Sequence, residues 1–562
     1  MINRRDLLAM AAAASTALPG MSFVKAAARQ SLTQDMLLAH EPFGRLTILH
    51  ISDLHAQVRP MYLREPSANV GTGEAKERPP HFTGDAFLRA FGIAEGSADA
   101  YALTSADYES LAGSYGKIGG LDRVATVINA VRADRGPENM LFLDGGDSWQ
   151  GSWVSLQTKG QDMIDLMSLL KPDAMTGHWE FTYGADRVKQ ATESLAYPFL
   201  AQNIRDTEWS EPVFPASKVF ERGGAKIAVI GQAFPYTPIA NPRWMIAKWE
   251  FGIREDELRK QVEKARAGGA DLVVLLSHSG FDADWKMATR INGIDVILTG
   301  HTHDALPRAV EVGRTLLIAS GSNGKFISRL DLEIRDKKVA GYRFKLIPIF
   351  ADVIEGDAGM AEAIDNSRAP FEGQLSAVLG QTESLLYRRG TFNGTLDHLI
   401  CEAIISERDC EIALSPGVRW GTTLLPGDAI TFEDIANATA ITYPACYRTQ
   451  MTGAQLKEIM EDIADNVFNP DPYYRQGGDM VRTGGLGYSI DVSAPAGKRI
   501  SDLTLLRTGD TIEAAKSYVV SGWASMNQEV EGPPIWQVVR DYVSRVKTVR
   551  LKENTAVKVR GL

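Results

Sequence analysis

Residue types that bind metal ions follow two short apolar segments in the middle of this sequence. Residues 271–276 lead into His278, and residues 294–299 lead into His301 and His303. Each apolar run stops abruptly at Ser, Gly and His, which is typical of a buried strand whose carboxyl end opens into a site. Two histidines two residues apart, with a third after the preceding run, indicate a metal site.

Three upstream segments repeat this order, an apolar run and then an acidic residue or a histidine. Asp53 and His55 follow residues 46–51, Asp147 follows residues 140–143, and His178 follows residues 173–176. Five of the nine histidines in the chain belong to this set. A single histidine is more often a packed or surface residue than a ligand, but five at successive strand ends, with two aspartates, favour a metal site.

The seven residues are too many for one tetrahedral ion and fit two ions that share a carboxylate. Histidine and carboxylate ligands without thiolates favour Mn, Fe or Zn over softer metals. Two ions ~3.5–4 Å apart hold the attacking and leaving groups of a displacement and generate hydroxide at neutral pH. The set therefore predicts a dinuclear hydrolytic centre.

The elements that must position these residues alternate between strands and helices from Arg45 to about Ile349. Residues 121–132 and 161–170 space their apolar side chains by three and four, which predicts two helices. Residues 226–231 predict a further strand. Because open α/β sheets bind ligands at the carboxyl ends of their strands, we expect an α/β layer structure with the site at that edge.

A long insertion, residues 56–116, interrupts this alternation with a stretch rich in Pro, Gly and charged residues. It begins just after Asp53 and His55, and insertions of this length in a compact domain are usually functional loops or lids. The alternative is a solvated loop without a role.

The charge and the cysteine content exclude some classes of function for this protein. The net charge of −10 argues against nonspecific nucleic-acid binding, which depends on Lys and Arg neutralising phosphates. The three cysteines, Cys401, Cys410 and Cys446, lack CxxC spacing, so they indicate neither a zinc knuckle nor a disulfide framework. A pairing among them cannot be read from the sequence.

The length of 562 residues exceeds what one core accommodates, so we expect two domains. The paired Arg4 and Arg5, an Ala-rich apolar run and a small-residue patch at 26–28 predict a twin-arginine signal peptide and export to the periplasm. The alternative is an ordinary N-terminal helix. The predicted boundaries are 1–28 for the signal peptide, 41–350 for the catalytic domain, 351–385 for a linker helix and 386–562 for the C-terminal domain.

Taken together, Asp-x-His, Gly-Gly-Asp, Gly-His-x-Glu, a strand-end His and Gly-His-x-His resemble the motifs of the calcineurin-like metallophosphoesterases. The C-terminal unit resembles the substrate-binding domain of 5′-nucleotidases. The resemblance implies an N-terminal four-layer α/β/β/α domain and a C-terminal α+β domain. It also implies two ligand sets that share Asp147: Asp53, His55, Asp147 and His303 for one metal, and Asp147, His178, His278 and His301 for the other.

One position departs from the nucleotidase pattern. Where that pattern has Gly-Asn-His-Glu, this sequence has Gly177-His178-Trp179-Glu180. An indole N–H does not titrate in the accessible range, so Trp179 cannot supply the proton that helps an alkoxide to leave. A thiol, with an unperturbed pKa near ~8.5, leaves without that help. Trp179 therefore predicts a sulfur leaving group; the alternative is that it only packs and another residue donates the proton.

This departure, together with the segments 64–67 and 415–421, resembles the SoxB thiosulfohydrolases of periplasmic sulfur oxidation. The resemblance implies two Mn²⁺ ions and a substrate carried as a cysteine S-thiosulfonate on the C-terminal arm of SoxY, which works in complex with SoxZ. The reaction releases sulfate from the carrier. No nucleic-acid partner is expected, and no membrane span is expected after signal removal.

Four residues are predicted to contact this substrate, and one further residue is a weaker candidate. Arg419 is the first choice because a guanidinium fork suits sulfonate oxygens; the alternative is an ion pair or a bridge between domains. Tyr474 and Asp479 are predicted to line a channel for a narrow peptide arm, and Asn69 is a further predicted contact. Arg64 is the weaker candidate and could serve the lid instead.

Two other functions remain open. A periplasmic 5′-nucleotidase or related phosphoesterase would share the fold and the metals and differ only in substrate. A non-catalytic scaffold subunit would keep its function without the Asp147 carboxylate.

Overall fold

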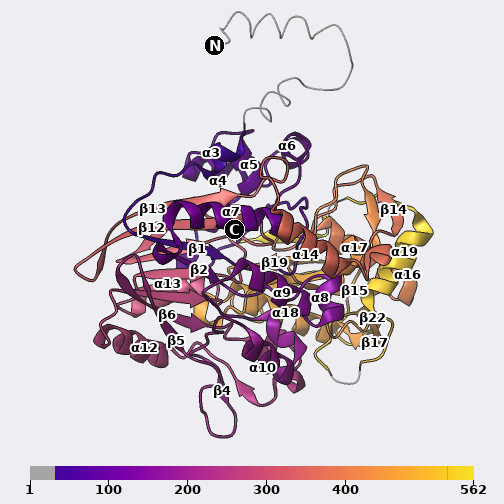
Figure 1. The fold of residues 1–562 in the computed structure, drawn as a ribbon. Helices are drawn as coiled ribbons and strands as arrows, with labels where there is room; N and C mark the ends of the chain where they lie inside the picture. The colour runs from indigo at the N-terminus through magenta and orange to yellow at the C-terminus, as the bar shows by residue number, and fades with distance from the viewer. Residues whose placement is uncertain (1–31, 528–529, 553, 562) are drawn as a thin grey trace, which may run out of the picture.

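The computed structural model describes residues 32–562 apart from 528–529, 553 and 562. The predicted signal peptide lies outside the described residues. Within that part of the chain, no helix combines the length and the apolar composition needed to cross a bilayer. Two α/β domains lie side by side, the first drawn from indigo to salmon and the second from orange to yellow (Figure 1).

Two sheets form the centre of the N-terminal domain. The first has the strand order β13-β12-β1-β2-β3, and the second has the order β10-β11-β9-β8-β6-β5. Strands β1, β2 and β3 run parallel to one another, as do β6, β8, β9 and β11. The strands of the first sheet are β1 (Leu46–Ile51), β2 (Met140–Asp144), β3 (Ala174–Met175), β12 (Phe326–Arg335) and β13 (Lys338–Pro348). Those of the second are β5 (Ser217–Arg222), β6 (Ala225–Gln232), β8 (Leu272–Ser277), β9 (Val296–Thr299), β10 (Val310–Val312) and β11 (Thr315–Ala319).

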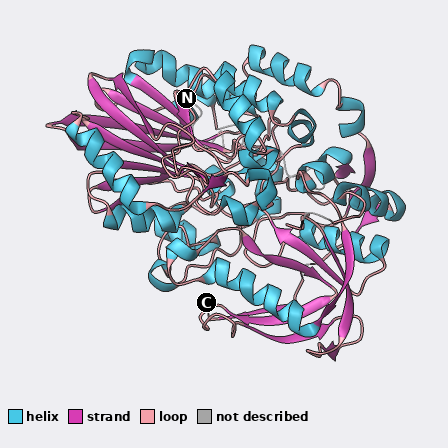
Figure 2. Cartoon of the chain, turned by 90° about the horizontal axis from the view of Figure 1, so that it is seen from below, coloured by secondary structure: helices cyan, strands magenta, loops and turns pink. Residues whose placement is uncertain are grey.

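The two sheets pack face to face. Each strand carries apolar side chains on both of its faces, so one face packs against the other sheet and the opposite face packs against helices. Leu46 and Ile48 of β1 join Val274 and Leu276 of β8 in the cluster between the sheets. Residues of the opposite parity, such as Leu49, face the helices instead. Helices α7 (Leu121–Arg135), α9 (Gln161–Leu170), α12 (Glu255–Ala267) and α13 (Phe281–Arg290) belong to the outer layers, which flank the strands in Figure 2. The predicted four-layer fold is confirmed.

The long insertion is more structured than its weak periodicity predicts. It contains the short helices η2 (Gly73–Ala75), α4 (Gly84–Phe91), α5 (Ala98–Leu103) and α6 (Tyr108–Tyr115). Its first residues contact the C-terminal domain: Tyr62 forms a β-bridge with Thr423, and the hydroxyl of Thr391 donates to the carbonyl of Ala68. The insertion therefore joins the two domains.

The described residues of the C-terminal domain form three small sheets with strand orders β17-β22-β15-β18, β21-β20-β19-β24 and β16-β14-β23. Its strands are β14 (Val378–Thr382), β15 (Ile412–Gly417), β16 (Ala429–Thr431), β17 (Tyr447–Thr452), β18 (Asp479–Gly484), β19 (Leu486–Asp491), β20 (Ile500–Leu505), β21 (Asp510–Thr511), β22 (Ser517–Gly522), β23 (Thr548–Val549) and β24 (Val557–Arg560). Its helices include α16 (Thr395–Arg408), α17 (Phe432–Thr439), α18 (Gly453–Phe468) and α19 (Ile535–Val546). Capping boxes at Thr431 and Thr452 fix the starts of α17 and α18.

The range predicted as a linker, 351–385, contains two helices and one strand. Helices α14 (Ala358–Arg368) and α15 (Glu372–Leu375) fit a helical connection. Strand β14, however, pairs with β16 and β23 of the C-terminal domain, so that domain begins before the predicted residue 386. This five-residue strand, although central in its sheet, has no clear alternation of apolar and polar residues and gave no signal in the sequence. The three cysteines are free and buried.

Candidate metal centre

The seven predicted ligands converge where strands of both sheets end. Asp53 and His55 follow β1, Asp147 follows β2, His178 follows β3, His278 follows β8, and His301 and His303 follow β9. All seven are buried, with exposed fractions between 0% and 9%. Their potential ligand atoms form two groups, each within 4.8 Å: Asp147, His178, His278 and His301 in one, and Asp53, His55, Asp147 and His303 in the other.

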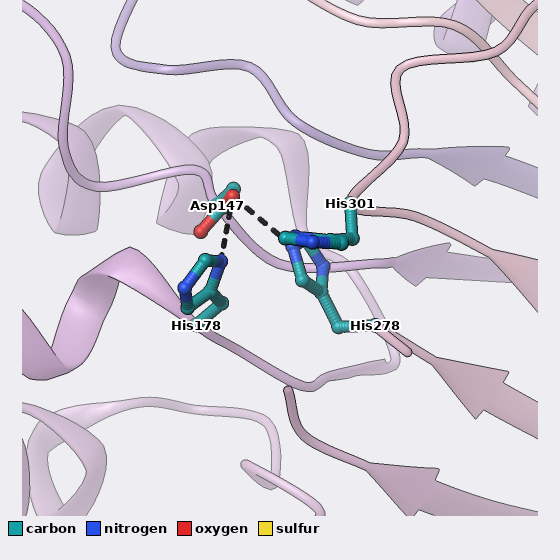
Figure 3. A group of neighbouring side chains, drawn as sticks. All are labelled: Asp147, His178, His278 and His301. Atoms are coloured by element: carbon teal, nitrogen blue, oxygen red, sulfur yellow. Dashed lines mark ion pairs between the residues drawn. The ribbon is translucent and has the colours of Figure 1, made fainter. Parts of the chain in front are cut away.

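Asp147 lies at the centre of both groups. Its Oδ2 is 3.0 Å from Nε2 of His278, 3.4 Å from Nδ1 of His178 and 3.7 Å from Nε2 of His55. Figure 3 shows the side chains of His178, His278 and His301 gathered beside this carboxylate. On the far side, Nε2 of His303 is 3.3 Å from Oδ1 of Asp53. This arrangement suits two cations that share one carboxylate.

The backbone of this centre is unusual, because five of the seven residues have positive φ angles. The values are 55° for Asp53, 47° for His55, 56° for Asp147, 74° for His301 and 60° for His303. The left-handed region costs a non-glycine residue roughly 1–2 kcal/mol. Each strand therefore turns sharply at its end so that the next side chain enters the site, and the surrounding structure holds that turn.

Buried atoms without hydrogen-bond partners test whether this set fits cations. Both ring nitrogens of His178, Nε2 of His278 and Nδ1 of His303 are buried and make no hydrogen bond of accepted geometry, although the Asp147 carboxylate lies within 3.4 Å of two of them. A buried nitrogen that lacks a hydrogen bond destabilises the folded chain unless an electrophile, such as a metal ion, accepts its lone pair. Carboxylate oxygens and imidazole nitrogens are ligands for borderline divalent ions. The residues thus fit a dinuclear metal site.

The charges of the centre lead to the same conclusion. Burial opposes ionisation of Asp147, but His278 and His178 hold the pKa of this carboxyl well below its usual value. Burial lowers the pKa of His303 to about 4, despite the nearby Asp53 carboxylate. Against burial, Asp147 and Asp53 raise the pKa of His278 to about 10. The site therefore holds ionised carboxylates in the interior, and these carboxylates stabilise a positive charge beside them.

Backbone carbonyls orient two of the histidines from within the catalytic domain. Nδ1 of His55 lies 3.1 Å from the Gln150 carbonyl, and Nδ1 of His278 lies 2.6 Å from the Gly145 carbonyl. A carbonyl only accepts, so Nδ1 carries the proton in each case and Nε2 is left for a metal.

Glu180 has a structural role that the sequence did not predict, although the residue stands in the Gly-His-x-Glu motif. Its carboxylate accepts the backbone N–H of His178 at 2.8 Å, of Ser148 at 2.8 Å and of Asp147 at 3.3 Å. Burial, followed by the Asp147 charge, raises the pKa of Glu180 to about 7. Glu180 therefore fastens the loop after β2 to the loop after β3. The fixed spacing between His178 and Glu180 in the sequence motif was the available signal for this role.

Trp179 lies directly beside the metal ligands. Its backbone N–H donates to Oδ1 of Asp147 at 2.6 Å. Its half-buried ring is 5.2 Å from the His178 ring and meets the Trp420 ring edge-on at 4.9 Å, while the Trp420 ring lies 5.4 Å from His55. Trp420, which was not predicted as a site residue, thus forms the C-terminal wall of the centre.

Arg419 bridges the two domains. Its Nη1 donates to the Thr302 carbonyl at 3.1 Å, and its Nη2 donates to the Gly478 carbonyl at 2.8 Å. Its Nε donates to Asp479 at 3.2 Å, and Asp479 also accepts from Arg482 at 2.9 Å. The alternative of an interdomain bridge therefore describes the contacts of Arg419 in this structure.

A cavity of about 80 Å³ lies beside His301, between the insertion and the C-terminal domain. Three of the predicted substrate contacts, Asn69, Arg419 and Asp479, line this cavity, whereas Trp179, Arg64 and Tyr474 are not among its lining residues. The Asn69 amide donates to Asp304 at 3.0 Å.

Arg64 and Tyr474 lie away from this cavity. The Arg64 guanidinium stacks 4.1 Å from the centre of the Tyr387 ring, and the Tyr474 side chain is 65% exposed. The structure thus gathers three of the predicted substrate contacts, Asn69, Arg419 and Asp479, at one cavity and separates Arg64 and Tyr474 from them.

Comparisons with known proteins agree with this geometry. The family model described as calcineurin-like phosphoesterase matches residues 46–305, and the one described as 5′-nucleotidase, C-terminal domain, matches residues 378–534. Snake venom 5′-nucleotidase of Naja atra is 26% identical over 69% of this chain and 79% of its own length. The 5′-nucleotidase of Rattus norvegicus is 24% identical over 77% and 84%.

Two solved structures extend the comparison. The sulfate thiohydrolase SoxB of Thermus thermophilus is 36% identical, with a TM-score of 0.90 over 93% of this chain and 98% of that chain. A 5′-nucleotidase precursor, also of Thermus thermophilus, is 19% identical, with a TM-score of 0.73 over 92% and 99%, a likeness of fold. The chain therefore belongs to the 5′-nucleotidase/calcineurin-like metallophosphoesterase superfamily of hydrolases.

Proposed function

We propose that this protein is a dinuclear-metal thiosulfohydrolase that removes the terminal sulfonate from a cysteine S-thiosulfonate on a carrier protein. The observation that carries the proposal is the position of Trp179. Its backbone N–H donates a hydrogen bond to Asp147, the carboxylate shared by both ligand groups, and its side chain cannot transfer a proton. An enzyme that expels an alkoxide gains typically ~10²–10⁴-fold from a proton donor. A persulfide leaves as an anion without one.

The bonds exchanged are defined by this substrate class. A water oxygen bonds to the sulfonate sulfur, and the bond from that sulfur to the outer sulfane sulfur breaks. The electron pair leaves with the carrier persulfide, and the products are sulfate, the persulfide anion and two protons. No oxidant or reductant is consumed.

The residues of the chain divide the work of this reaction. Asp53, His55, Asp147 and His303 would hold one divalent cation, and Asp147, His178, His278 and His301 the other. Such a pair, proposed as Mn²⁺, supplies charge to the sulfonate oxygens and lowers the pKa of a water molecule. Glu180 fixes the position of Asp147 relative to His178 through their backbone N–H groups. The rings of Trp179 and Trp420 exclude bulk water from the His55 side.

The size of the cavity beside His301 supports a small acidic group rather than a nucleoside. Its volume of about 80 Å³ is well below the ~300–1,000 Å³ typical of sites for drug-sized ligands. Tyr473 is also engaged, because its hydroxyl donates to Glu255 at 2.9 Å and Lys286 lies 4.1 Å from the centre of its ring. Tyr473 is therefore not free to stack on a base.

The likeness to SoxB of Thermus thermophilus, at 36% identity over 98% of that chain, supports the same substrate class. By this likeness we propose the arm of SoxY, in complex with SoxZ, as the partner. We also propose the periplasm as the place of action, reached through the twin-arginine signal of residues 1–28. Thiosulfate oxidation would be the pathway served.

A direct comparison of two substrates tests the proposal. The metal-loaded protein is incubated with a thiosulfonate-loaded carrier peptide and, separately, with a nucleoside monophosphate. We expect the mass of the peptide adduct to fall by the sulfonate group while sulfate appears, with little phosphate released from the nucleotide. Fast nucleotide turnover with an unchanged peptide mass would instead support a 5′-nucleotidase, the activity named for the relatives that are 23–26% identical.

A further inference from the structure

We propose that the backbone tract Gln476-Gly477 of the C-terminal domain positions His301, so that this domain completes the metal group formed by Asp147, His178, His278 and His301. The inference rests on the metal pair of the proposed function but not on the identity of its substrate. Gly477 is the residue that makes the contact sterically possible.

The first step is the hydrogen bond of His301. Its Nε2 lies 3.0 Å from the carbonyl oxygen of Gln476. Because that oxygen only accepts, Nε2 carries the proton, and Nδ1 keeps the lone pair that a metal requires. Partners of this kind fix the tautomer and ring orientation of a metal-ligating histidine.

The second step is the confinement of the imidazole. The Phe234 ring stacks on it with 4.1 Å between centroids and 28° between planes. The His178 ring meets it edge-on at 5.0 Å. With only 9% of His301 exposed, the ring cannot swing away from the tract without losing these contacts.

The third step is the absence of a side chain at residue 477. A Cβ there would overlap Nε2 of His301 and would lie 2.7 Å from its Cδ2 and 3.1 Å from its Cε1. At Gly478, which has a similar φ of +80° against +72°, the nearest atom to a Cβ is 3.7 Å away. Residue 477 thus tolerates only glycine on steric grounds, and residue 478 serves as its matched control.

The fourth step is the anchoring of the tract. The N–H of Gln476 donates to Asn466 of α18 at 3.1 Å, and strand β18 begins at Asp479. Arg419 donates both to the Gly478 carbonyl and to the carbonyl of Thr302, the residue after His301. The tract and the His301 loop are therefore held in register, and a displaced C-terminal domain would withdraw the Gln476 carbonyl from His301.

The test compares Gly477→Ala with Gly478→Ala in the full mature chain by titration with Mn²⁺ and by metal analysis. We expect Gly478→Ala to bind two ions per chain like the original protein. We expect Gly477→Ala to retain one ion tightly and to bind the second about 10–100-fold more weakly, the usual cost of a lost outer-shell partner. Equal metal affinities of the two variants would overturn the proposal.

A double-mutant cycle separates the contact from a folding defect. In a His301→Ala background the methyl group added at residue 477 no longer meets an imidazole, so adding Gly477→Ala is expected to change Mn²⁺ affinity no further. Its Tm should fall only as much as for Gly478→Ala, because both residues have a positive φ. An undiminished effect in that background would assign the loss to backbone strain and refute the proposal. If the original chain binds fewer than two ions, both the metal pair and this inference fail. If it binds two but hydrolyses only nucleotides, the substrate assignment alone fails.

Discussion

The metal centre has two sides that are built differently. On the catalytic-domain side, each ligand is a few residues from a strand end, and the orienting carbonyls of Gly145 and Gln150 belong to the same domain. On the C-terminal side, His301 donates its hydrogen bond to the carbonyl of Gln476, 175 residues away in the sequence. One side is fixed by local chain geometry and the other by domain docking, so metal binding and substrate entry need not respond alike to mutation.

The largest effect is expected from removing the element that both sides share. Asp147→Asn keeps the shape of the side chain but removes the charge that lies within 3.0–3.7 Å of three histidines. We expect bound Mn²⁺ to fall from two ions to one or fewer and hydrolysis to fall by about 10⁴-fold, because both ions depend on this carboxylate. Metal analysis and initial rates measure the two quantities.

A scaffold subunit would behave differently. It would keep its interactions in Asp147→Asn, and a pull-down of its partners with unchanged yield and no measurable turnover of the original protein would favour that interpretation.

The pH dependence of stability examines the catalytic-domain side. Asp284 of α13 accepts a 2.6 Å hydrogen bond from Ser277 at the end of β8, and burial raises the pKa of Asp284 from 3.8 to about 7. The unfolded chain loses this proton at lower pH than the folded chain. The contribution of Asp284 to the free energy of unfolding therefore falls as pH rises from about 4 to about 7 and then levels off.

Asp284→Asn imitates the protonated carboxyl and removes this dependence. Between pH 5 and pH 8 the variant is expected to gain about 3 kcal/mol over the original chain, two pH units at about 1.4 kcal/mol each. Chemical denaturation at both pH values measures the change. Asp256→Asn in exposed α12 serves as the control and is expected to give the same difference at both. A constant difference for Asp284→Asn would refute the assignment.

The two sides also differ in how far the sequence predicted them. The seven ligands were found because strand-end positions are local: an apolar run followed by Asp or His identifies them without knowledge of the fold. The left-handed backbone at Asp53 and His301 was not predicted, since neither is a glycine. Arg419 was predicted as a substrate contact from its chemistry, but the carbonyls of Thr302 and Gly478 that occupy its donors come from distant segments. Such partners depend on how the domains dock, which no local pattern encodes.

Substitution of Trp179, the residue at which this chain differs from the nucleotidase motif, tests what distinguishes the site from that of a nucleotidase. Trp179→His introduces a titratable group beside Asp147, whose Oδ1 accepts the backbone N–H of residue 179. We expect hydrolysis of a nucleoside monophosphate to rise about 10²-fold, the lower range for general acid catalysis. Thiosulfonate hydrolysis should not rise.

Trp179→Phe is the matched control, because it keeps an aromatic ring against Trp420 and carries no proton to donate. If Phe raises nucleotide hydrolysis as much as His does, the gain comes from space in the site rather than from a proton. Trp179 would then be a packing residue, and the argument for a sulfur leaving group would lose its basis.

The smallest effect, and the one that bears most directly on the comparison of the two sides, is expected at Arg419. Lysine keeps the positive charge but offers one flexible ammonium in place of a planar fork that reaches Thr302, Gly478 and Asp479 together. If Arg419 mainly holds the domains in register, Arg419→Lys and Arg419→Gln should raise KM alike, by about 10-fold, or about 1.4 kcal/mol. Both should also weaken the second Mn²⁺ ion, because the Gln476 carbonyl loses its register with His301. If Arg419 mainly attracts the sulfonate, Lys should retain most of the affinity that Gln loses, and Mn²⁺ binding should not change. Parallel measurement of KM and Mn²⁺ affinity in the two variants therefore decides whether the C-terminal side of the centre acts through the substrate or through His301, and the contacts of the guanidinium favour His301.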